Sequence, residues 1–182
     1  RGVRVHLDGA RLFNSAAFLK KDVKEIASSA DTVMVSLSKG LASPVGSLLC
    51  GDGDTMERAK RFRKMLGGGM RQTGWLCACG IEALSAENIS FLEADHKNAR
   101  YLAESLASLS WCSIDLERVQ TNFVVCKLSP EIDGEWLVNS LEKHGILLNL
   151  RGKGSIRFCF SREVTREDTE FVVKAVRAIE AV

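Results

Sequence analysis

An acidic residue and a lysine each follow a β-rich run near the start of the chain. Asp8 comes directly after the alternating segment 3–7, and Lys39 comes just after the segment 32–37. Since open α/β sheets bind ligands where their strands end, both side chains are expected at such an edge. An amine there could attack the aldehyde of pyridoxal phosphate, and a carboxylate could keep the pyridine nitrogen protonated. Spacing alone leaves a second interpretation open, in which Lys39 is a solvated loop residue and Asp8 a turn residue.

The elements that must position these residues alternate between strands and helices. In order, we expect helices at 12–19 and 22–29, a strand at 45–50, a basic helix at 55–66, a helical passage at 73–109, a strand at 122–128, a helix at 134–144, a strand at 154–160 and a helix at 166–182. Asp52 and Asp54 are placed to cap the basic helix, and glycines 67–69 end it. The last two strands are each followed by a helix, which predicts a small α/β layer in the second half.

Charge and hydropathy exclude several classes of protein. The 25 Lys and Arg residues against 23 Asp and Glu leave a formal charge of +2, too small for binding nucleic acid through its phosphates. A hydrophobic fraction of 46% with two prolines is typical of a packed globular protein. No stretch approaches the ~20 consecutive apolar residues of a membrane span. We therefore expect a soluble protein with neither nucleic-acid nor membrane partners.

The cysteines indicate the compartment. Six of them are scattered through apolar stretches, which favours a reducing, cytoplasmic environment. Cys77 and Cys79 form a Cys-x-Cys pair, but no second Cys or His pair stands at zinc-finger spacing. We interpret both as buried apolar residues and predict no metal site. Because the chain starts at Arg1 without an initiator Met and soon enters a strand-like segment, we also expect it to be part of a longer protein.

Four sequence strings, in consecutive order, resemble those of L-threonine aldolases. They are His-Leu-Asp-Gly-Ala-Arg at 6–11, Ser-Leu-Ser-Lys-Gly-Leu at 36–41, Pro-Val-Gly-Ser at 44–47 and Arg-Lys-Met-Leu-Gly-Gly-Gly-Met-Arg-Gln at 63–72. The resemblance is close from Val5 to about Gly80. It continues more loosely in the second half, with Gln-Thr-Asn at 120–122 and Ile-Arg-Phe at 156–158.

This resemblance implies the aminotransferase-like fold type I, an α/β architecture in which a large domain with a mainly parallel sheet holds the cofactor. Residues 1–85 would form the C-terminal part of that large domain, including its last strands. Residues 86–182 would form a linking helix and a small C-terminal α/β domain. In the family, the cofactor-stacking histidine and much of the phosphate loop lie further upstream, so this chain would hold part of the site.

The resemblance also implies roles for individual residues. Lys39 would be the catalytic lysine that binds pyridoxal 5'-phosphate as a Schiff base, and Asp8 would bind the pyridine nitrogen. Arg11 would contact the cofactor hydroxyl or the substrate carboxylate, which suits its planar guanidinium, and a surface salt bridge is the alternative. Arg157 matches the family's carboxylate-binding arginine, and an apolar strand rarely carries an unpaired charge.

Two further basic residues flank the glycine triplet. Lys64 and Arg71 could bind a phosphate or reach the site of a neighbouring subunit. Lys64 could equally belong to the solvated face of the basic helix, and the glycines could cradle a phosphate or end a helix. His6 alternates with apolar residues and should pack or hydrogen-bond locally. After Arg157 the family commonly continues with Val-Thr-His, whereas Cys-Phe-Ser stands at 159–161, which puts the packing around Arg157 in question.

The implied activity is the cleavage of L-threonine or L-allo-threonine to glycine and acetaldehyde, by a pyridoxal-phosphate-dependent carbon–carbon lyase of amino-acid metabolism. A homodimer or homotetramer with shared active sites is expected, with a small amino acid as substrate. Two alternatives stay open. One is another fold-type-I lyase that acts on β-hydroxy amino acids by β-elimination. The other is a catalytically incomplete fragment or an assembly partner.

Overall fold

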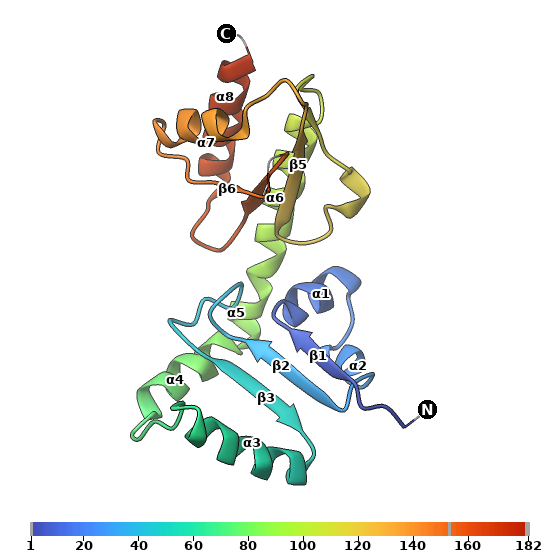
Figure 1. Ribbon diagram of the computed structural model, residues 1–182, viewed down its shortest axis with the longest axis vertical. Coiled ribbons are helices and arrows are strands. Elements are labelled where there is room, and N and C mark those ends of the chain that lie inside the picture. Colours follow the sequence, from blue (N-terminus) through green and yellow to red (C-terminus); the bar gives the residue numbers. More distant parts are fainter. Residues whose placement is uncertain (1, 153, 181–182) are drawn as a thin grey trace. The chain divides into compact units, whose positions relative to one another are not determined.

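The computed structural model describes residues 2–152 and 154–180, and the chain divides into two compact units, Arg1–Leu92 and Glu93–Val182 (Figure 1). The boundary was expected between residues 85 and 86. Helix α6 (Leu92–Leu106) starts at the last residue of unit 1 and continues in unit 2. That unit 1 belongs to a larger cofactor-binding domain stays a prediction.

Unit 1 holds a three-stranded sheet. Its elements are β1 (His6–Gly9), α1 (Leu12–Leu19), α2 (Val23–Ala27), β2 (Thr32–Ser36), β3 (Ser47–Gly51), α3 (Gly53–Met65), α4 (Gly74–Ala83) and α5 (Ala86–Ser90). The strand order is β1-β2-β3, with β1 parallel to β2 and β2 antiparallel to β3. The antiparallel member of this otherwise parallel sheet is β3, because residues 37–46 return the chain directly from β2 without a crossover helix.

The core of unit 1 lies against β2. Val33 and Val35 are buried and alternate with partly exposed neighbours, as a strand with one covered face requires. They belong to one cluster with residues of α1, the loop after β2, the end of α4 and the first residue of α6, namely Leu12, Leu37, Leu41, Ala83 and Leu92. Strand β3, by contrast, is exposed along its described length.

The first strand is shifted relative to the prediction. It starts at His6 rather than at residue 3, because its partner β2 starts at Thr32, which lies opposite His6 in the register. Nδ1 of His6 lies 2.8 Å from Oγ1 of Thr32, so this histidine does make a local hydrogen bond. The two valines before the strand are exposed, at 80% and 50%.

The helical passage predicted at 73–109 is three helices. Helix α4 ends at Ala83, and Ser85 then caps a new helix, because its hydroxyl accepts a hydrogen bond from the backbone N–H of Asn88 at 3.1 Å. Apolar periodicity continues across this break, which is why the sequence pattern alone suggested one element.

Both ends of α3 have defined caps. The carboxylate of Asp52 accepts a hydrogen bond from the backbone N–H of Thr55 at 2.8 Å, so Asp52 is the cap and the helix starts at Gly53, before the predicted residue 55. At the other end Gly67 has a φ of +80°, and the N–H groups of Gly67 and Gly68 donate to carbonyls of the last turn. This Schellman motif explains the start of the glycine triplet as a helix ending.

Unit 2 is a four-stranded antiparallel sheet with helices on its covered face. Its elements after α6 are β4 (Cys112–Ser113), the 3-10 turn η1 (Leu116–Arg118), β5 (Phe123–Leu128), α7 (Gly134–Glu142), β6 (Asn149–Leu150), β7 (Ser155–Cys159) and α8 (Arg166–Glu180). The strand order is β4-β5-β7-β6. The short strands β4 and β6 were not predicted, because two residues are too few for a recognisable alternation.

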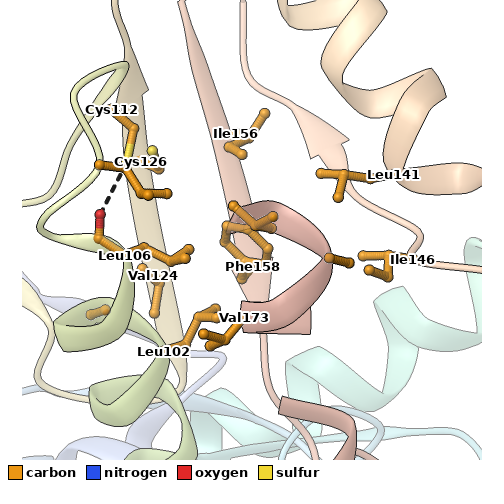
Figure 2. Packing of buried hydrophobic residues seen from close by; sticks show 14 of the residues in the cluster. Leu102, Leu106, Cys112, Val124, Cys126, Leu141, Ile146, Ile156, Phe158 and Val173 are labelled. Carbon is orange, nitrogen blue, oxygen red and sulfur yellow. Dashed lines mark hydrogen bonds between the residues drawn. The ribbon is translucent and has the colours of Figure 1, made fainter. Parts of the chain in front are cut away.

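The core of unit 2 fills the space between this sheet and its helices. Figure 2 shows side chains of β5 and β7 meeting those of the helices, and the buried residues include Leu102, Leu106, Val124, Cys126, Ile156, Phe158 and Val173. Sγ of Cys112 donates to the carbonyl of Leu106 at 3.6 Å. The alternating residues of β5 and β7, among them Phe123, Val125 and Arg157, lie on the opposite, open face.

The surface cysteines correct one prediction. Cys77 is exposed and Cys79 partly exposed, whereas both were expected to be buried. The reason is that the buried residues of α4, the helix that carries them, are Gly80 and Ala83.

Among residues 2–152 and 154–180, no group of three His, Cys, Asp or Glu side chains is placed to hold a metal ion. None of the described helices is long and apolar enough to cross a membrane.

Candidate active site

The loop between β2 and β3 presents Lys39. Leu37 and Leu41 on either side of it are buried, at 6% and 3% exposure, while Lys39 itself is exposed. The backbone N–H of Ala42 donates to the Lys39 carbonyl at 2.9 Å, and Ala42 adopts a φ of +56°. Two apolar anchors and a tight turn therefore fix the backbone on both sides of a lysine whose side chain reaches solvent.

A buried asparagine and a close-packed glycine fix the position of this loop. Nδ2 of Asn88 donates to the Leu41 carbonyl at 2.9 Å and to the Ala83 carbonyl at 2.8 Å, and Asn88 is 5% exposed. A Cβ on Gly40 would lie 2.9 Å from both Oδ1 of Asn14 and a methyl of Leu92. Glycine at position 40 thus lets the loop lie directly against α1 and the start of α6.

The far end of the loop is closed by its own backbone. The N–H of Leu37 donates to the Gly46 carbonyl at 3.0 Å, and the N–H of Ser43 donates to the Leu37 carbonyl at 2.9 Å. Oγ of Ser43 donates to the Val45 carbonyl at 3.2 Å, and Gly46 has a φ of +121°. The string at 44–47 therefore has a structural role, which is to bring the chain back from the lysine turn into β3.

Asp8 lies at the same edge of the sheet as the lysine loop. In the parallel register Asp8 pairs with Met34 and Gly9 with Val35, so β1 and β2 end together. The side chain of Asp8 is exposed, and its Oδ1 accepts a hydrogen bond from Ala10 N at 3.1 Å. A Cβ on Gly9 would lie 2.3 Å from the Met34 carbonyl, so glycine is required for the two strands to approach at this point.

Arg11 follows in the turn between β1 and α1. It is partly buried and occupies the cap position of α1, where its carbonyl accepts a hydrogen bond from Ser15 N at 3.0 Å. The turn and the lysine loop line one small hollow of about 10 Å³, whose wall residues include Arg11, Asn14, Ser36 and Gly40. The structure thus brings the segments that carry Asp8, Arg11 and Lys39 together at one edge of unit 1.

Arg157 belongs to the open face of the sheet in unit 2. Its strand neighbours Ile156 and Phe158 are buried, so Arg157 points to the other face. Its Cζ lies 4.7 Å from the ring centroid of Phe123, and its Nε is buried without a hydrogen-bond partner among the described residues. The six ion pairs recorded for the described part of the chain do not include Arg157, so no carboxylate of these residues pairs with its guanidinium.

The two remaining candidates lie at the surface. Lys64 is in the last turn of α3 and Arg71 just before α4, and both are exposed. Within residues 2–152 and 154–180, neither takes part in a recorded ion pair. The Schellman motif explains Gly67 without a ligand. A phosphate-binding role for this segment stays a prediction.

Several residues that shape the site were not singled out from the sequence. Asn14, Asn88 and Asn122 are buried polar residues, at 2%, 5% and 1% exposure, and Phe123 contacts Arg157. Asn122 stood in one of the resembling strings, and that string was the available signal. Spacing offers none for Asn14 or Asn88, because Asn88 bonds to backbone carbonyls, one of them 47 residues away, and Asn14 lies against Gly40, which is distant in the sequence.

Comparison with known proteins relates this geometry to a family. The beta-eliminating lyase family matches residues 1–129. Low-specificity L-threonine aldolase 1 of Arabidopsis thaliana is 42% identical over 175 residues, which cover 94% of this chain and 48% of that protein. The low specificity L-threonine aldolase of Escherichia coli K12 is 38% identical over 178 residues, 98% of this chain and 51% of that protein. The chain thus spans about half the length of the curated relatives it matches.

Solved structures agree on the fold. Threonine aldolase of Leishmania major superposes with a TM-score of 0.75 at 19% identity, covering 98% of this chain and 52% of that one. The histidinol-phosphate aminotransferase of Clostridium acetobutylicum gives 0.68 at 19% identity, covering 97% and 54%. At this identity the likeness concerns the fold alone, and it confirms the expected aminotransferase-like fold type I. With the sequence match over residues 1–129, the chain belongs to the beta-eliminating lyase family.

Proposed function

We propose that the full-length protein is a pyridoxal-phosphate-dependent aldolase that cleaves L-threonine and L-allo-threonine to glycine and acetaldehyde. The observation that carries this proposal is the exposed Lys39 on a firmly anchored loop, at the sheet edge that it shares with Asp8. The relatives that are 38% and 42% identical are named as low-specificity L-threonine aldolases, which supports this substrate class.

The residues at this edge fit the cofactor. Nζ of Lys39 is the amine that would hold it covalently, and the exposed carboxylate of Asp8 would accept a hydrogen bond from the protonated pyridine nitrogen. The carboxylate keeps an ordinary hydrogen bond to Ala10 N through Oδ1, which orients it. When bound, pyridoxal phosphate supplies an electron sink for the carbon atom that loses its bond to Cβ.

The side chains of this chain would bind and orient the substrate. Arg157, whose guanidinium pairs with no carboxylate of the described residues, would bind the substrate carboxylate through two parallel hydrogen bonds, and Arg11 would assist from the turn after β1. Fixing the carboxylate sets which bond of Cα stands perpendicular to the cofactor ring, and that orientation selects Cα–Cβ cleavage. Lys64 and Arg71 would add positive charge for the phosphate. The base that takes the β-hydroxyl proton is not among the residues we assign.

We also propose a homodimer or homotetramer with shared active sites, a small amino acid as substrate and a cytoplasmic location. A second candidate reaction follows from the name of the matched family. A β-elimination on L-threonine would release ammonia and 2-oxobutyrate instead of acetaldehyde and glycine. Measuring acetaldehyde and ammonia in the same reaction separates the two activities.

The test uses the full-length protein with added pyridoxal phosphate. We expect a long-wavelength absorbance band from the lysine-bound cofactor, and acetaldehyde release from L-threonine. Lys39→Ala should lose both, whereas Lys24→Ala, which removes another exposed lysine of unit 1, should keep both. A band that survives in Lys39→Ala would refute the assignment of Lys39. A wild-type protein that binds the cofactor and releases only ammonia would refute the aldolase activity.

A further inference from the structure

We propose that Phe123 is a positioning residue, which holds the guanidinium of Arg157 in the orientation that binds the substrate carboxylate. This inference rests on the proposed function of Arg157. Its starting point is the contact between the two side chains, with Cζ of Arg157 4.7 Å from the centre of the Phe123 ring. A guanidinium is weakly hydrated and stacks readily on aromatic rings, which makes this a stabilising contact.

The register of the sheet makes the contact a built-in feature. Strands β5 and β7 are antiparallel, with Val125 opposite Arg157 and Phe123 opposite Cys159. Phe123 is therefore the diagonal neighbour of Arg157 on the same face, a separation that aromatic and long side chains bridge. The backbone beside it is pinned by Asn122, whose Nδ2 donates to the Phe160 carbonyl at 2.7 Å.

A neutral ring positions the arginine without competing for its charge. A carboxylate neighbour would orient the guanidinium too, but it would occupy the hydrogen-bond donors that a substrate carboxylate needs. Nε of Arg157 is buried and has no hydrogen-bond partner within the described part of the chain, so hydrogen bonds from Nε do not hold the side chain. The recorded contact that holds the guanidinium is the one with the ring of Phe123, and a stacked ring does not occupy the hydrogen-bond donors of the two terminal nitrogens.

The experiment compares Phe123→Leu, Phe123→Tyr and Arg157→Lys in the full-length protein. Phe171→Leu, an exposed phenylalanine on α8, is the matched control for the loss of a ring. We expect Phe123→Leu to raise KM for L-threonine by about five- to tenfold with kcat changed less than twofold, as the loss of a cation–π contact implies. Phe123→Tyr, which keeps the ring, and Phe171→Leu should both leave KM near the wild-type value.

Binding of glycine, followed through the cofactor absorbance, gives a second readout that does not depend on cleavage. Arg157→Lys and Phe123→Leu should both weaken it. If Arg157→Lys weakens glycine binding and Phe123→Leu does not, the positioning role is refuted while the role of Arg157 stands. If Arg157→Lys has no effect either, the proposed carboxylate site itself is refuted. If the protein releases no acetaldehyde but still binds glycine through Arg157, the aldolase proposal fails and the role of Phe123 is decided by the binding data.

Discussion

A buried carboxyl group in α6 should make the stability of unit 2 depend on pH. Asp95 is 2% exposed, and its Oδ2 has no hydrogen-bond partner among the described residues. Burial raises the pKa of Asp95 to about 6, although the positive charge of Arg162 acts in the opposite direction. The folded state therefore binds this proton more tightly than the unfolded chain does. We predict that Asp95→Asn, which keeps the shape and removes the charge, stabilises the protein at neutral pH.

The magnitude follows from the two pKa values. In the unfolded chain Asp95 titrates near its ordinary value of 3.8, and in the folded chain near 6. The stability contributed by the protonated group is fully present below pH 3.8 and is lost as the pH rises through 6, because the unfolded state then binds fewer protons. At about 1.4 kcal/mol per pKa unit, the full cost of the charged form is about 3 kcal/mol. Between about pH 4.5 and 7.5, roughly 2 kcal/mol of it develops.

Urea unfolding at these two pH values measures the effect. Many carboxyl groups titrate in this range, so the informative quantity is the difference in free energy of unfolding between Asp95→Asn and the wild type. That difference should move by about 2 kcal/mol in favour of the variant from about pH 4.5 to 7.5. Glu142→Gln, which removes an exposed carboxyl on α7, is the control for the loss of a surface charge. A constant difference for Asp95→Asn would show that the folded state does not raise its pKa.

Three further substitutions test the supports of the site and one helix cap. Asn88→Ala should cost about 1–3 kcal/mol, because two buried carbonyls lose their donor, and should speed amide hydrogen exchange in the lysine loop. Gly40→Ala should cost about 1–3 kcal/mol from overpacking in urea unfolding, whereas Gly53→Ala, where no atom lies within 4 Å, should not. Hydrogen bonds from Thr165 lower the pKa of Asp168, so the ionised carboxylate stabilises the folded state at neutral pH. Asp168→Asn should therefore have a lower melting temperature than the wild type at neutral pH. The difference between the two melting temperatures should shrink as the pH falls below 3.8.

Elements with strong local signals were predictable from the sequence, and those that depend on partners were not. The helix at 12–19 and the strand in 123–128 have an apolar pattern that tertiary contacts reinforce. The start of β1 depends on its register with β2, in which His6 pairs with Thr32, and no local pattern encodes that pairing. The break before α5 depends on one serine side chain, whose capping bond is invisible to apolar periodicity.

The candidate site divides in the same way. The residues to which we assign chemistry, Lys39 and Asp8, follow β-rich runs, and that position together with the resembling strings singled them out. The residues that hold them in place were missed, because Asn88 and Gly40 act through backbone and packing contacts between segments far apart in the sequence. Unless it stands in a resembling string, a polar residue that supports a loop is recognised only when the structure shows that it is buried.

Two of the cations that we assign to ligands, Lys39 and Arg157, have supports that leave their charge unpaired, which leads to a last prediction. Lys39 is held through its loop backbone and Arg157 through an aromatic ring. Within residues 2–152 and 154–180, neither takes part in a recorded ion pair with a carboxylate. Val125 lies directly opposite Arg157 on the same open face, and it is 39% exposed. A glutamate at position 125 would pair with the guanidinium.

Val125→Glu should therefore raise KM for the amino acid by about two- to fivefold, the worth of an exposed ion pair that the substrate must displace. Val125→Gln has the same length and no charge, and should leave KM near the wild-type value. High salt should reduce the effect of the glutamate, because it screens exposed pairs. Equal KM values for the Glu and Gln variants at low salt would contradict the idea that the charge of Arg157 binds the substrate carboxylate.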